Sequence, residues 1–150
     1  MTLLWESPIT NRSEEDLKKP DGIGYLNAAD LNRIESNTSY IADKLNAYLY
    51  EVHMREHPKT VWKFTDIPDT DDIWRICSNL TAIKKAFFIP EEVPDLQNKR
   101  LNYEDINQLE KILLLHKYAL DWMAAGFKKS GTFKAGCRNE RVFLPKRRMQ

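Results

Sequence analysis

Two histidines four positions apart are the first candidates for chemistry in this sequence. His53 and His57 flank Glu56 in the stretch HMREH, and on a helix this spacing would bring both imidazoles to one face, as two metal ligands require. The sequence offers no third ligand, and the glutamate does not stand where a zinc protease has it. Histidines near the carboxyl end of a helix also interact favourably with its dipole. We therefore favour a structural role and expect no metal or other cofactor.

The remaining titratable residues also fit structural positions. His116 falls among the apolar positions of a predicted helix, where a hydrogen-bonded core histidine is commoner than a catalytic one. The acidic residues cluster at 14–16, 69–72 and 91–92, in predicted linkers or helix starts. The phosphate loop GxxxxGK[ST], the dinucleotide motif GxGxxG and the hydrolase elbow GxSxG are absent. We predict that the protein is not an enzyme.

A basic segment, residues 127–150, is the one charged feature that favours a binding role. Its basic residues are Lys128, Lys129, Lys134, Arg138, Arg141, Lys146, Arg147 and Arg148. Glu140 is the one acidic residue among them, so the segment has a net charge of +7. Because the whole chain has a net charge of +1, the other residues have a net charge of −6. Aromatic residues are interleaved, so the segment could bind nucleic acid through phosphates, with an affinity that falls with salt. We prefer the alternative, docking on the acidic part of a neighbouring copy.

The elements that position these residues begin with an internal repeat. LNAADLNRIE at 26–35 is followed by LNYEDINQLE at 101–110. Asn27 and Asn102 are good helix N-caps, and Asp30 and Asp105 fall where a carboxylate can bond back to the cap. The sequence therefore predicts two helices that begin in the same way, one from Asn27 to a stop before Pro58 and one from Asn102 to Gly126.

Apolar residues alternate at spacings of three and four along both helices and along a third segment at 69–87. We expect this stripe to form the core or the interface through Leu31, Ile34, Ile41, Leu45, Ile73, Ile76, Leu80, Ile83, Ile106, Leu109, Leu113 and Leu120. The last helix has the broadest apolar arc, because Ile112, Leu114 and Leu115 widen it, and we expect it to be central.

The predicted fold is mainly α: a three-helix bundle with long polar arms and a small C-terminal β-hairpin. Residues 1–26 would form an extended N-terminal arm, 27–126 the bundle, and 127–150 the basic hairpin and tail. The hairpin rests on the alternating pattern at 132–135 and 141–144.

Asparagine is a mediocre helix former, yet Asn32, Asn37, Asn46 and Asn79 all lie in predicted helices. They are either exposed surface or polar contacts that set the register of a helical assembly.

Length and composition agree with one ordinary domain of 150 residues. No apolar stretch approaches the roughly 18 residues of a membrane-spanning helix. The first residues lack the basic-then-apolar order of a secretory signal, so we expect a soluble protein made in a cytoplasm.

Cys77 and Cys137 lack zinc-ligand spacing, and we interpret both as free thiols.

The helix start LNAADLNRIESN resembles small virion proteins of tailed phages and prophages of Gram-positive bacteria. The similarity includes the segment WESPIT before it, the segment TDIPDTDDIWRICSNLTAIKKAF after it, and the stretch SGTFKAG. It covers about two thirds of the chain. Such proteins share an LNxxDLNRIExN helix start, often in two copies. In the second copy here Gln108 and Ile112 stand where Arg33 and Asn37 stand in the first.

Two functions follow as hypotheses. The resemblance implies a non-enzymatic structural component of a virion, in the tail or baseplate, that contacts copies of itself and other virion proteins. Its localisation would be the virion, assembled in the bacterial host cytoplasm. The alternative is a small nucleic-acid-binding regulator that uses the basic C-terminal hairpin.

Overall fold

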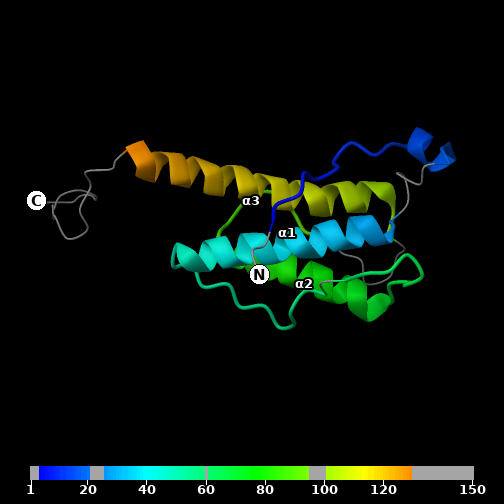
Figure 1. The fold of residues 1–150 in the computed structure, drawn as a ribbon, viewed down its shortest axis with the longest axis horizontal. Coiled ribbons are helices and arrows are strands. Elements are labelled where there is room, and N and C mark those ends of the chain that lie inside the picture. Colours follow the sequence, from blue (N-terminus) through cyan, green and yellow to red (C-terminus); the bar gives the residue numbers. More distant parts are fainter. Residues whose placement is uncertain (1–3, 21–25, 60, 95–100, 130–150) are drawn as a thin grey trace, which may run out of the picture. The chain divides into compact units, whose positions relative to one another are not determined.

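The chain is mainly helical. The computed structural model describes residues 4–20, 26–59, 61–94 and 101–129, with the side chains of 127–129 excepted. It contains a short 3-10 helix η1 (Glu14–Lys18) and the helices α1 (Ala28–Ala47), α2 (Thr70–Ala86) and α3 (Tyr103–Lys129), and no strand occurs in this part of the chain (Figure 1). Residues 1–120 form one compact unit and residues 121–150 a second. The predicted hairpin and tail lie outside the described residues, apart from the last turn of α3.

All three long helices begin with the same local hydrogen bonds. In α1 the side chain of Asn27 accepts from the backbone N–H of Asp30, whose carboxylate accepts from the backbone N–H of Asn27. Asn102 and Asp105 make the same pair of bonds before α3. These reciprocal bonds satisfy backbone donors that a helix start leaves free.

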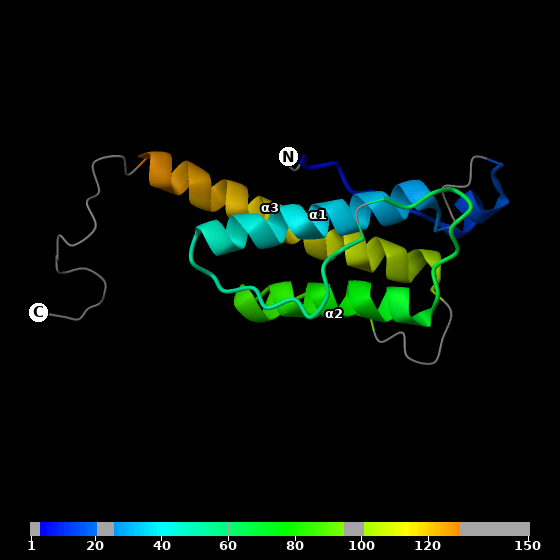
Figure 2. The same ribbon diagram turned by 60° about the horizontal axis from the view of Figure 1, so that its bottom comes forward.

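The three helices run parallel, with their amino ends together (Figures 1 and 2). Near these ends, Arg33 of α1 pairs with Glu110 of α3, and Arg75 of α2 pairs with Glu35 of α1. Parallel neighbours cannot be joined by short loops, because each connection must run back along the bundle. Two connections, residues 48–69 and 87–102, therefore return the chain to the starting end.

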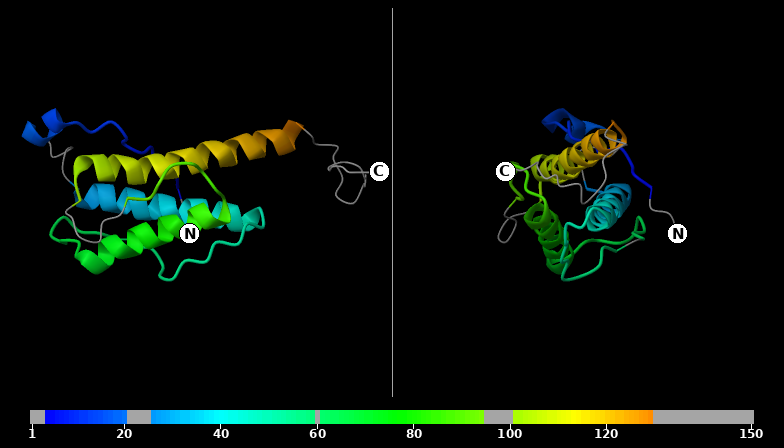
Figure 3. Two further views of the ribbon diagram at one scale, coloured as in Figure 1. Left: turned by 180° about the vertical axis from the view of Figure 1, so that it is seen from behind. Right: turned by 90° about the vertical axis from the view of Figure 1, so that its left-hand side faces the viewer.

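The core lies between the helices within residues 1–120. The end-on view in Figure 3 shows the helix ribbons grouped around it. Of the twelve expected core or interface positions, eleven are buried, and Ile73 is half-buried. The connections add Trp62 and Ile89 to the core. In α3 the side chain of Ile112 is fully buried, while Leu115 packs against the core from its edge.

The first helix is shorter than predicted. It ends at Ala47, whereas the apolar spacing predicted a helix running to a stop before Pro58. The end is a Schellman motif: Tyr50 N–H donates to Leu45 O at 2.9 Å, and Leu49 N–H donates to Asn46 O at 3.0 Å. Leu49 has φ 69, the left-handed conformation in which glycine is usual. Because leucine stands there, the stop is hidden in the sequence.

The end of the third helix was also predicted wrongly. Gly126 was expected to end it, but α3 continues to Lys129. A Cβ atom added at Gly126 would meet nothing within 4 Å, so the backbone there is ordinary helix with room for a side chain.

The N-terminal residues lie against the bundle. Residues 4–16, which we call the first strap, run toward the end at which the helices begin, and Arg12 within them is 4% exposed. Residues 51–59 and 61–67, which we call the second strap, run in the same direction along α1 and α2 (Figures 1 and 2). No helix in the described part of the chain has the length and apolarity needed to cross a membrane.

Replacing Leu49 by glycine should stabilise the protein. The left-handed conformation costs a non-glycine residue about 1–2 kcal/mol, and the greater freedom of glycine in the unfolded chain offsets part of this gain. We expect the free energy of unfolding in urea to rise by about 0.5–1 kcal/mol. Val61→Gly is a matched control, because Val61 is also exposed but has no positive φ, and it should destabilise. A destabilised Leu49→Gly variant would contradict the assigned helix end.

Candidate functional site

The structure describes little of the predicted basic partner-binding segment. Lys128 and Lys129 occupy the last turn of α3, where only the backbone is described. The other six, Lys134, Arg138, Arg141, Lys146, Arg147 and Arg148, lie outside the described residues. The described polar residues that the fold brings together are instead at the amino ends of the helices.

The first of these clusters, the first anchor, joins the first strap to α1 and α3. It consists of Arg12, Asp30, Arg33, Asn107 and Glu110. The Arg12 guanidinium contacts Asp30 Oδ1 and Glu110 Oε2, each at 2.7 Å. Arg33 contacts the same two carboxylates at 2.5 Å. The side chains of Arg12 and Glu110 are 0% exposed, so two positive and two negative charges neutralise one another away from water.

Asn107 binds the backbone of the first strap. Its Oδ1 accepts from Arg12 N–H at 3.1 Å, and its Nδ2 donates to Arg12 O at 2.9 Å. A side-chain amide thus replaces the strand partner that an extended residue would otherwise need for its two backbone groups. Arg12 is therefore fixed by both its backbone and its side chain.

The second anchor holds the second strap in the same way. It consists of Asn32, Glu35, Trp62 and Arg75. Asn32 Oδ1 accepts from Trp62 N–H at 2.7 Å, and Asn32 Nδ2 donates to Trp62 O at 3.0 Å. The buried Glu35 carboxylate accepts from the Trp62 indole at 2.5 Å and from the Arg75 guanidinium at 2.9 Å.

The internal repeat encodes these two anchors. Asn32 and Asn107 are equivalent positions of the repeat, as are Glu35 and Glu110. In each copy the asparagine binds the backbone of a strap residue, and the glutamate accepts from that residue's side chain. The glutamate also binds an arginine from the next helix. The repeated sequence therefore serves strap binding as well as helix capping.

The helix α2 is a third copy that sequence reasoning missed. DIWRICSN at 72–79 matches DLNRIESN at 30–37 without a gap, with Asp, Arg, Ile, Ser and Asn identical. Asp69 and Asp72 form the same reciprocal bonds at its start. The residues that make an anchor, asparagine and glutamate, are replaced by Trp74 and Cys77, which is why the match is easily overlooked.

The pair of helices α2 and α3 lacks the arginine–glutamate bond that joins α1 to α3 and α1 to α2. Gln108 stands at the arginine position of α3, and Cys77 stands at the glutamate position of α2. Gln108 instead donates to Glu91 Oε2 at 3.2 Å and to Glu92 O at 3.0 Å, both in the connection after α2. Both members of the charged pair are thus replaced together.

The charge state of the anchors is set by close pairing. Burial lowers the pKa of Arg33, but the hydrogen bonds and charges of Glu110 and Asp30 outweigh it, so that the pKa is raised. The pKa of Arg75 is raised in the same manner, with Asp72 and Glu35 opposing desolvation. Both guanidiniums therefore remain charged, and the anchors act as fixed ion pairs.

The asparagines divide between the two interpretations that the sequence left open. Asn37 and Asn79 are 0% and 1% exposed, and Asn32 is half-buried, so none of the three is exposed surface. Asn32 and Asn37 are internal polar contacts, whereas Asn79 Oδ1 has no hydrogen-bond partner. The Asn37 side chain binds both backbone groups of Glu6. Asn46 is exposed and accepts from Val52 N–H.

The three histidines lie apart from both anchors. His53 and His57 are on the second strap and not on a helix, so the i, i+4 argument for a shared face does not apply. No group of three residues suited to a metal occurs among the described residues. His116 is a buried core histidine: its Nδ1 lies 2.9 Å from Ile112 O, and its Nε2 lies 3.0 Å from Phe87 O.

Comparison of the chain with protein-family models, with curated proteins and with solved structures gives no match.

Replacing Glu110 by glutamine should strongly destabilise the protein. It would leave two buried guanidiniums with one carboxylate, and breaking a buried pair costs about 3–5 kcal/mol. Urea unfolding measures the loss. Glu91→Gln is the control, because its pair with Lys111 is partly exposed and worth less than about 1 kcal/mol. Equal, small losses in the two variants would mean that the first anchor does not hold the fold.

Acid should destabilise the protein through His116. Burial lowers the pKa of His116 below 6.5, against the opposing hydrogen bonds to Ile112 and Phe87. The unfolded chain then binds a proton that the folded chain does not, so the free energy of unfolding falls as the pH drops below about 6.5. A His116→Gln variant should lose this part of the slope, as measured by urea unfolding between pH 7 and 5. An unchanged slope would contradict the assignment.

Proposed function

We propose that this protein is a non-enzymatic structural subunit of a phage virion, in the tail or baseplate. It would contact neighbouring subunits by helix packing and by extended segments, with copies of itself and other virion proteins as partners. The observation that carries the proposal is the pair of anchors. This fold already holds extended segments in place through a buried amide and a buried carboxylate, and subunits that exchange or wrap extended segments need this kind of contact.

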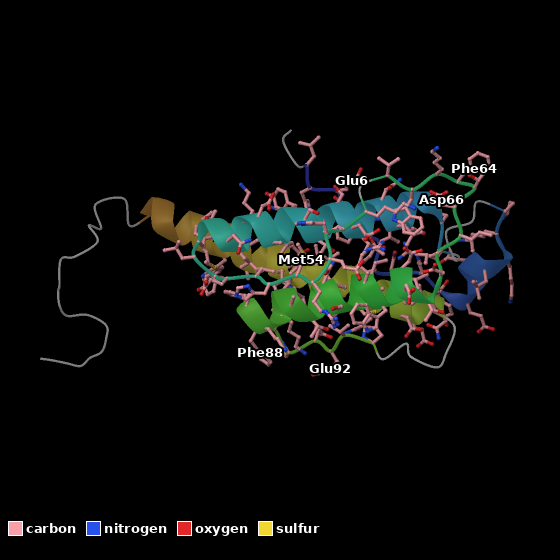
Figure 4. All side chains as sticks on the ribbon, turned by 90° about the horizontal axis from the view of Figure 1, so that it is seen from below. Glu6, Met54, Phe64, Asp66, Phe88 and Glu92 are labelled. Carbon is pink, nitrogen blue, oxygen red and sulfur yellow. The ribbon has the colours of Figure 1, made fainter. Side chains whose placement is uncertain are left out.

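Apolar side chains exposed on the connections support the proposal. Phe64 is 93% exposed and Ile67 88% in the second strap, while Phe88 after α2 is 74% exposed. Figure 4 shows Phe64 and Phe88 on these connecting segments, pointing away from the helices. Contiguous exposed apolar surface marks sites that bind other proteins, and Phe64 and Ile67 lie three residues apart in the second strap.

Charge supplies a second contact. Residues 127–150 carry +7, and the remainder of the chain carries −6. Opposite charges on two parts of the same chain favour association between copies at low salt, since surface electrostatics weaken as ionic strength rises. The resemblance of the first helix start to virion proteins agrees with this assembly role, and the location we propose is the virion, assembled in the host cytoplasm.

Nucleic-acid binding remains the second candidate. Its supporting observation is the same basic segment, in which Phe127, Phe133 and Phe143 lie among eight basic residues. Aromatic residues can stack on bases while basic ones bind phosphates.

Glutamine substitution of all eight basic residues of 127–150 in the full chain distinguishes the two functions. The wild type should associate at low salt and dissociate as salt rises, and the neutralised variant should stay monomeric in sedimentation velocity. The exposed residues Lys18, Lys63 and Lys85 supply the control, and their glutamine variants should associate normally.

Three outcomes would contradict the proposal. One is a wild-type chain that is monomeric and indifferent to salt. Another is absence of the chain from purified virions by mass spectrometry. The third is a salt-sensitive affinity for duplex or single-stranded DNA that the neutralised variant loses, which would favour the regulator.

A further inference from the structure

The two straps share a short sequence pattern. ESPITNR at 6–12 aligns without a gap with EHPKTVW at 56–62, so that glutamate, proline and threonine recur at the same spacing. Four residues after each anchor residue stands an aspartate, Asp16 or Asp66. Asp16 Oδ2 accepts from Ser13 N–H at 2.8 Å, and Asp66 Oδ2 accepts from Lys63 N–H at 2.9 Å. Both straps therefore end in the same turn.

The straps also occupy equivalent places in the bundle. The first contacts α3 through Asn107 and α1 through Asn37. The second contacts α1 through Asn32, and the Arg55 guanidinium lies 4.9 Å from the centre of the Trp74 ring on α2. The first strap thus lies across α3 and α1, and the second strap lies across α1 and α2 in the same register.

This register pairs Glu6 with Glu56, and the helix repeat pairs Asn37 with Asn79. Asn37 Oδ1 accepts from Glu6 N–H at 3.0 Å, and its Nδ2 donates to Glu6 O at 2.8 Å. Asn79 is buried to the same degree, yet its Oδ1 has no hydrogen-bond partner. Glu56 is exposed. One pair of bonds is therefore missing from an otherwise repeated arrangement.

A buried amide oxygen without a partner is costly and rare in proteins. The repeated arrangement shows what would satisfy it, because the equivalent asparagine binds one residue of extended backbone. The stacking of Arg55 on Trp74 already holds the neighbouring residue over α2, and Met54 lies over the bundle in Figure 4.

We propose that Asn79 is a binding site for the backbone of Glu56, and that the second strap has a seated conformation in which this site is filled. In it Glu56 N–H donates to Asn79 Oδ1, and Asn79 Nδ2 donates to Glu56 O. The seated form predominates in solution, and the structure shows the strap unseated. The second strap therefore has two positions. The positions of His53, His57 and their neighbours on the surface differ between the two. This inference does not depend on the proposed function.

Amide hydrogen exchange in the full chain tests the proposal. Seating should slow exchange at Glu56 at least about tenfold relative to an unstructured amide, since exchange then requires the site to open. Asn79→Leu should remove this protection and leave that of Glu6 intact. Asn37→Leu is the matched control: it should remove the protection of Glu6 and leave that of Glu56 intact.

The wild type alone also tests the proposal, in case a leucine variant fails to fold. A nuclear Overhauser contact between the Asn79 side-chain amide and the backbone of Glu56 is expected. Its absence, or a contact from Asn79 to the first strap of a second copy, would overturn the proposal. So would an Asn79→Leu variant that is more stable than the wild type with unchanged exchange at Glu56, because this is the behaviour of a buried amide that never finds a partner.

Discussion

Extended backbone laid against an apolar core must find hydrogen-bond partners, and this requirement explains most of the structure. Because the helices are parallel, the second strap runs back along the bundle between two of them, while the first strap lies before α1 in the chain. Buried N–H and C=O groups of these two segments have no neighbouring strand. Asn32 and Asn107 each supply one donor and one acceptor to a single strap residue. The backbone of the straps is thereby satisfied at Arg12 and Trp62, which are both buried.

The buried charges follow from the same arrangement. Glu35 and Glu110 sit one turn after these asparagines and bind the side chain of the same strap residue. An arginine from the adjacent helix completes each site, so the carboxylate links strap, helix and next helix. Replacing such a charged network by apolar residues often leaves the free energy of unfolding unchanged. The network does fix the register of the strap, because a slipped strap would leave charges buried and unpaired. Parallel helices with similar apolar stripes need such a device, since the stripes alone admit several registers.

The sequence predicted the parts of the fold that depend on spacing alone. Capping residues and the three-four alternation of apolar positions identified three helices and nearly all of the buried stripe. They could not reveal the end of α1, because Leu49 takes a conformation usually given to glycine. They were also silent on helix direction, since a parallel and an antiparallel helix bury the same stripe.

The anchors were within reach of the sequence only in part. The repeat was found, and internal asparagines were one of two interpretations, but Arg12 and Trp62 were not singled out. They lie in extended segments without periodicity. They also differ in chemical type, although each binds an asparagine through its backbone and a glutamate through its side chain. Their common signal was the shared ExPxT pattern before each of them. The third helix copy was hidden because Trp74 and Cys77 replace the two residues that make an anchor.

The central claim is that two asparagines of the repeat bind the straps, and amide exchange at the two anchored residues tests it most directly. Trp62 and Arg12 should exchange as slowly as core helix amides. Asn32→Ala should release Trp62 alone, and Asn107→Ala should release Arg12 alone. If both amides exchange at the rate of exposed backbone in the wild type, or if neither substitution changes them, the straps are not held in this way and the account is wrong.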